Sequence, residues 1–88
     1  MPRSRPEPLS EYFAANVRRV REELGMSQES LAEVALKGDV RRLQRLEAGQ
    51  YDVRLSTVAA LARHLGVLGA ALLAPAKVTS RGPGRPSR

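Results

Sequence analysis

A first stripe of apolar side chains runs through the N-terminal third of the chain. Its members follow the spacing i, i+4, i+7 and i+11: Phe13, Val17, Val20 and Leu24. This spacing places them on one side of an α-helix, the side that faces a protein core. Ser10 precedes the stripe and is a residue type that caps helix N-termini, whereas Gly25 follows it and favours a helix end. The pattern predicts a helix that begins at Ser10 and stops at Gly25.

Two shorter helices are predicted next. Ser27 is a capping residue, and Met26 and Leu31 are spaced as a hydrophobic staple around the helix start. The inward face of this helix comprises Leu31, Ala32 and Ala35. The stretch "LKGD" breaks the pattern, and Asp39 then caps a third helix that ends at Gly49. The inward residues of the third helix are Leu43 and Leu46.

The last two predicted helices complete an all-α fold. The fourth has an inward stripe of Leu55, Val58, Leu61, Ala62 and Leu65. Gly66 ends it, and the short stretch "LGAALL" forms a fifth helix that stops before Pro75. Because no window shows the period-2 alternation of a half-buried strand, the pattern indicates five short helices and no sheet.

Proline positions divide the chain into a domain and two tails. Residues 9–74 contain no proline, whereas Pro2, Pro6 and Pro8 crowd the start and Pro75, Pro83 and Pro86 the end. We therefore expect a flexible Pro/Arg arm over residues 1–8, one helical domain over 9–75 and a disordered basic tail over 76–88. A chain of 88 residues buries only about 60% of its unfolded surface, so its core is small.

Charge is concentrated in the tails. The formal net charge is +6, of which residues 1–8 contribute +1 and residues 77–88 contribute +4. A polyanionic partner is indicated, with nucleic acid favoured over a membrane, because no segment is both basic and amphipathic with aromatic anchors. The chain has no cysteine, no signal-like apolar start and no run of about 20 apolar residues, so we expect a soluble cytoplasmic protein without a membrane partner.

The third predicted helix carries a cationic outer face. At 100° per residue, Leu43, Leu46 and Glu47 share one side. The opposite side holds Arg41, Gln44, Arg45 and Ala48, and Arg42 lies on a flank. These arginines either face water, as charged side chains on helices commonly do, or meet a negatively charged partner.

Two short helices joined by a four-residue turn, the second one basic, are typical of a unit that inserts a helix into the DNA major groove. The stretches "MSQESLAEVA", "RRLQRLEAG" and "LSTVAALARHLGV" resemble, in that order, the Cro/repressor-type helix-turn-helix family, often called the XRE family. The matching residues are Ser27, Gln28, Leu31, Ala32, Arg45, Leu46, Glu47, Gly49, Leu61, Ala62, Leu65, Gly66 and Val67. The resemblance covers roughly residues 10–73 and implies a lambda-repressor-like fold and a transcriptional regulator that binds double-stranded DNA.

The resemblance also implies individual roles. Gln28 takes the place of a residue that meets phosphate or a base at the edge of the DNA site. Val40, Arg41 and Arg45 fall where the family reads base edges, flanked by Arg42 and Gln44, and we assign Arg42 to phosphate. Independently, an arginine fork suits guanine O6 and N7, so we expect a guanine read by Arg41 or Arg45.

Further implications concern the scaffold. Arg21 and Glu47 take the places of a partly buried ion pair that ties the first helix to the third, so both are structural. The turn "ALKGD" is one residue longer than the family's usual spacing, which shifts the expected angle of the recognition helix. The fifth helix has neither the family's usual capping serine nor its acidic residues.

The C-terminal segments suggest a second copy and additional DNA contacts. Part of the stripe Leu68, Ala71, Leu72 and Leu73 belongs to the core, and the rest suits a homodimer interface, which the family commonly builds near this helix. The tail "RGPGRPSR" partly matches a minor-groove AT-hook. Its basic residues, Arg81, Arg85 and Arg88, are possible DNA contacts, against the alternative of a solubilising tail.

No residue pattern indicates an enzyme, a metal site or a cofactor. His64 is the only histidine and suits a helix C-terminus, and the serines have no histidine and acid arranged around them. The favoured function is that of a small repressor or controller protein, which acts by promoter occupancy or by contact with RNA polymerase. Two alternatives stay open. One is a DNA-binding antitoxin that grips a toxin through the apolar C-terminal segment, and the other is a helical adaptor for an acidic protein.

Overall fold

Five α-helices form the regular structure in the computed structural model, which describes residues 8–50 and 52–77. In chain order they are α1 (Leu9–Glu23), α2 (Gln28–Ala35), α3 (Val40–Glu47), α4 (Leu55–Leu65) and α5 (Gly69–Leu73). The predicted all-α class and helix order are confirmed within this part of the chain. None of these helices is both long and apolar enough to cross a bilayer.

Local capping chemistry sets most of the helix ends. The Ser27 hydroxyl accepts a hydrogen bond from the Ser30 N–H at 2.9 Å, and Asp39 Oδ1 accepts one from the Arg42 N–H at 3.1 Å, as predicted. Gly66 follows α4 with φ +73°, a left-handed conformation that glycine adopts without strain. The prediction for Ser10 was wrong: α1 begins at Leu9, because the Pro8 carbonyl already accepts bonds from the N–H groups one turn later.

The core lies where α1 packs against α3, α4 and α5 and α2 packs against α3 and α4. Its most deeply buried large side chains are Phe13, Val17, Leu31, Leu43, Leu46, Leu61 and Leu72. Two predicted core residues are exposed instead, Leu24 by 53% and Leu55 by 79%. Leu24 follows the last residue of α1 and Leu55 is the first residue of α4, so both lie at helix ends that no neighbouring helix covers.

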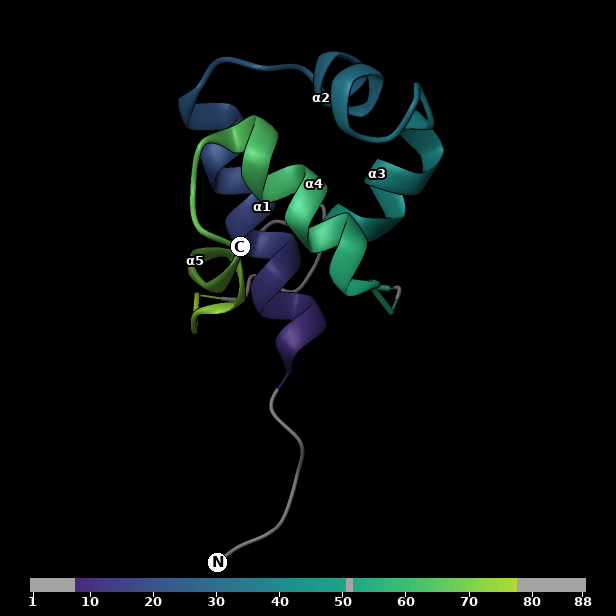
Figure 1. Cartoon of the computed structure of the whole chain (residues 1–88). Helices are drawn as coiled ribbons and strands as arrows, with labels where there is room; N and C mark the ends of the chain where they lie inside the picture. Colours follow the sequence, from purple (N-terminus) through teal and green to yellow (C-terminus); the bar gives the residue numbers. More distant parts are fainter. Residues whose placement is uncertain (1–7, 51, 78–88) are drawn as a thin grey trace, which may run out of the picture.

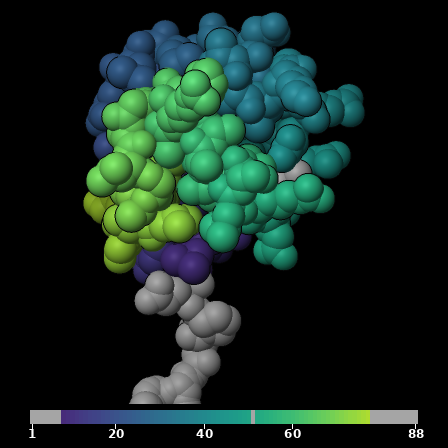
Figure 2. Space-filling model, in the orientation of Figure 1, coloured from purple at the N-terminus to yellow at the C-terminus, as the bar shows by residue number. Residues whose placement is uncertain are grey.

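The arrangement separates the two halves of the molecule. Figure 1 shows α2 and α3 together at one end, with α5 lower down on the opposite side and α1 running between them. In the space-filling view, α4 lies across the front of the molecule and the α2–α3 unit occupies its upper right (Figure 2). The α2–α3 unit therefore lies apart from α5.

A buried asparagine that sequence reasoning missed holds α5 against α1. Asn16 Nδ2 donates to the carbonyl oxygens of Leu72 at 3.0 Å and Ala74 at 2.9 Å, and Asn16 Oδ1 accepts from Arg19 Nη2 at 3.2 Å. Since α5 has only five residues and no side-chain cap, these bonds and the buried Leu72 side chain hold it in place.

Candidate nucleic-acid interface

The turn between α2 and α3 uses two successive left-handed residues. Lys37 has φ +57° and Gly38 has φ +85°, and the Gly38 N–H donates to the Ala32 carbonyl at 2.9 Å. The Asp39 N–H bonds to the Leu36 carbonyl at 3.1 Å, which closes the turn. The chain thus reverses between α2 and α3 through its backbone conformation, at the cost of a strained lysine.

The outer face of α3 is cationic, as predicted. Leu43 and Leu46 are buried and seat the helix on the core, whereas Arg41, Gln44 and Arg45 are exposed. Among residues 8–50 and 52–77, neither Arg41 nor Arg45 has a side-chain hydrogen bond or ion pair. Both guanidinium groups are therefore available to an external anion or base edge.

Two other residues predicted to contact DNA are less exposed than these roles suggest. Val40 is half-buried and packs against the core. Arg42 is half-buried as well, and its Nη2 donates to Thr57 Oγ1 of α4 at 2.7 Å. Its Nε is buried with no partner among the described residues. Arg42 therefore joins α3 to α4, a link that sequence reasoning missed because Thr57 is a buried hydroxyl inside an apolar stripe.

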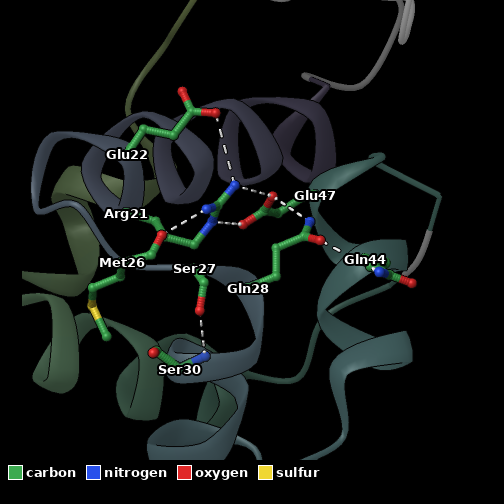
Figure 3. A network of polar contacts seen from close by, with 8 residues as sticks. All are labelled: Arg21, Glu22, Met26, Ser27, Gln28, Ser30, Gln44 and Glu47. Atoms are coloured by element: carbon green, nitrogen blue, oxygen red, sulfur yellow. Dashed lines mark hydrogen bonds and ion pairs between the residues drawn. The ribbon is translucent and has the colours of Figure 1, made fainter.

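A buried ion pair ties α1 to the end of α3, as predicted from the family resemblance. Arg21 Nε lies 2.7 Å from Glu47 Oε2, and Arg21 Nη2 lies 3.0 Å from Glu47 Oε1 (Figure 3). Arg21 Nη1 also donates to the Met26 carbonyl at 2.8 Å, before α2 begins. The hydrogen bonds to Glu47 raise the pKa of Arg21 above its ordinary value, so the guanidinium stays charged.

The ion pair extends to the start of α2 through a glutamine. Gln28 Nε2 donates to Glu47 Oε1 at 3.0 Å, and Gln28 Oε1 accepts from Gln44 Nε2 at 3.4 Å (Figure 3). Gln28, predicted to meet DNA at the edge of the site, is half-buried and held between the two helices. Side chains predicted to contact DNA, from both α2 and α3, thus lie together in one region of the molecule.

The proposed dimer residues divide between core and surface. Leu72 is 1% exposed, which corrects its assignment to an interface: its side chain is already buried within one chain. Leu68 is 78% exposed, Ala71 is exposed and Leu73 is half-buried. Arg81, Arg85 and Arg88 lie outside the described residues.

Comparisons with known proteins agree with this geometry. The helix-turn-helix family model matches residues 17–70. A hypothetical transcription factor from Neisseria is 31% identical, with a TM-score of 0.72 over 85% of this chain and 87% of that one. A restriction-modification controller protein from Aeromonas hydrophila is 30% identical, with a TM-score of 0.67 over 72% of this chain and 94% of that one. A search of curated proteins found no match.

Proposed function

Because the chain belongs to the XRE-type helix-turn-helix family of DNA-binding regulators, we propose that it binds a specific duplex DNA sequence as a homodimer. Its operator would be an inverted repeat, since a two-fold symmetric protein dimer matches a two-fold symmetric site. In this proposal the protein acts by covering a promoter or by touching RNA polymerase.

The observation that carries this proposal is a pair of exposed arginines on α3 that have no ion pair within the described part of the chain. Arg41 and Arg45 lie on the face opposite the buried Leu43 and Leu46, and neither has an acidic partner among the described residues. An arginine fork donates to guanine O6 and N7 together, which discriminates against other bases by about 1–3 kcal/mol. We assign at least one guanine of the half-site to Arg41 or Arg45.

The flanking residues take supporting roles in this proposal. Arg42 is anchored to Thr57 at 2.7 Å, which suits a contact to the phosphate backbone better than a reach into the groove. Val40 is half-buried and apolar, so the one base group that it could contact is the methyl group of thymine. Arg81, Arg85 and Arg88 would add phosphate contacts, so truncation after Pro75 should lower affinity and flatten its salt dependence.

A two-fold interface near α5 is supported by exposed apolar surface. Leu68 and Ala71 are exposed and Leu73 is half-buried, next to the core residue Leu72. A dimer built there would place two recognition helices about 34–36 Å apart, one turn of DNA. Sedimentation at tens of micromolar tests this point, and a monomer at that concentration would contradict it.

In vitro selection from random duplex DNA at two salt concentrations tests the function as a whole. We expect an inverted repeat whose half-site contains guanine, with affinity that falls as salt rises. If no sequence is enriched at moderate salt, specific DNA binding is refuted. That result would favour the hypothesis of a helical adaptor whose arginines contact an acidic protein. Copurification of a second polypeptide would favour the antitoxin reading.

A further inference from the structure

A continuous series of hydrogen bonds connects the buried ion pair with the exposed face of α3. It runs from the Glu47 carboxylate through Gln28 to Gln44, over N-to-O distances of 3.0 and 3.4 Å (Figure 3). Burial decreases along the series: Glu47 is buried, Gln28 half-buried and Gln44 exposed. The series therefore begins in the buried part of the molecule and ends on the exposed side of α3, the face proposed to meet DNA.

The chemistry of the carboxylate sets the direction of every bond in the series. The Glu47 carboxylate accepts two hydrogen bonds from Arg21 and offers only acceptor oxygens, so Gln28 must turn its NH₂ group toward it. The Gln28 carbonyl oxygen then faces away, toward α3. An oxygen in that position can only accept, so Gln44 must turn its own NH₂ group toward Gln28. The side-chain amides of Gln28 and Gln44, each of which could otherwise flip by 180°, are thereby both oriented.

Gln44 keeps the groups needed to read a base. Its Oε1 and its second N–H form no other bond among the described residues. A glutamine that offers one acceptor and one donor matches N6 and N7 of adenine in the major groove. Gln44 shares the exposed side of α3 with Arg41 and Arg45, so an adenine contacted by Gln44 would lie near the proposed guanine contact.

We propose that Gln44 is a specificity-determining residue that selects adenine, and that Gln28 and Glu47 are positioning residues that orient its amide. This inference rests on the proposed function, because it names one base read by the same surface. Arg21 has a role in this inference only through Glu47, whose carboxylate it holds with two hydrogen bonds.

The experiment compares in vitro selection by the full chain and by the variants Gln44→Met, Gln28→Met and the double variant. Methionine keeps the length of glutamine and removes both hydrogen-bonding groups. The matched control is Gln50→Met, because Gln50 is also an exposed glutamine near α3 but has no side-chain bond in this series. Thermal unfolding of each variant verifies the fold, which Gln28→Met should retain because Arg21 still donates to both oxygens of Glu47.

We expect one adenine column of the selected motif to depend on Gln44, with its preference reduced on the order of tenfold in Gln44→Met. Gln28→Met should weaken the same column and no other, and the double variant should resemble Gln44→Met, because the two residues act in one series. Gln50→Met should leave that column unchanged. A second variant, Gln28→Lys, keeps a donor for Glu47 and removes the acceptor for Gln44, so it should weaken the same column despite its added charge.

Two results would overturn the inference and leave the proposed function standing. One is a selected motif that Gln44→Met does not change, and the other is a Gln28 effect at a different column or one that adds to the Gln44 effect. A wild-type chain that selects no sequence overturns both, which separates the two failures.

Discussion

The Arg21–Glu47 pair offers a direct test of how the recognition helix is held. Both side chains are nearly buried, at 10% and 4% exposed, and they meet through two bonds of 2.7 and 3.0 Å. We predict that Glu47→Leu lowers the free energy of unfolding by about 3–5 kcal/mol, because it removes the buried counter-charge of Arg21 and leaves its guanidinium only the exposed Glu22 carboxylate, 3.8 Å away. A domain of this length has about 4–13 kcal/mol in total, so this loss is a large part of it.

The double variant separates the charge effect from packing. Arg21→Met with Glu47→Leu replaces two buried charges by apolar groups of similar size, which is often neutral or stabilising. We therefore expect the double variant to be more stable than either single variant, with a coupling energy of about 3 kcal/mol or more between the two positions.

Urea unfolding followed by far-UV circular dichroism measures these free energies, and the exposed pair Arg19–Glu23 supplies the control. Those side chains are 56% and 62% exposed and 3.4 Å apart, so Glu23→Leu should cost only about 0.5 kcal/mol. The reasoning fails if Glu47→Leu costs no more than Glu23→Leu, or if the two single losses simply add in the double variant.

Three further predictions concern the scaffold and the DNA contacts. Asn16→Ala should cost about 1–3 kcal/mol in urea unfolding and speed hydrogen exchange in α5, since the Leu72 and Ala74 carbonyls lose their donor; unchanged exchange would contradict it. Lys37→Gly should stabilise by up to about 1 kcal/mol by relieving the left-handed lysine, and Gly38→Ala should destabilise by about 1–2 kcal/mol; the urea midpoints decide the sign of each. Arg41→Ala should relax selection at one base, whereas Arg42→Ala should weaken binding to specific and random DNA alike; equal losses for Arg41→Ala would remove its base-reading role.

Features that depend on residues close in sequence were predictable. The capping roles of Ser27 and Asp39 follow from side chains that bond to an N–H three residues later, and the end of α4 follows from the backbone freedom of Gly66. The order and number of helices in the described residues follow from apolar periodicity and from these end signals. The ion pair of Arg21 and Glu47 was predictable only through the family resemblance, because its partners lie 26 residues apart.

Features that depend on which part of a helix its neighbours cover could not be read from the pattern. Periodicity places Leu24 and Leu55 on the apolar side of their helices, yet no neighbouring helix reaches those ends and both remain exposed. Leu72 belongs to a stripe that suited either core or interface, and its burial follows from the docking of α5 on α1 through Asn16.

The candidate DNA-binding face of α3 likewise combines features set by the local sequence with features set by tertiary packing. The amino-acid sequence determined that α3 is a short cationic helix seated by Leu43 and Leu46, because helix formation and amphipathicity are local properties of the chain. Tertiary packing decided that Arg42 turns to Thr57 while Arg41 and Arg45 stay exposed, and that Gln28 joins Glu47 to Gln44. A hydrogen bond between distant residues forms only when their helices fix both the separation and the direction of two side chains, and a one-dimensional pattern contains neither.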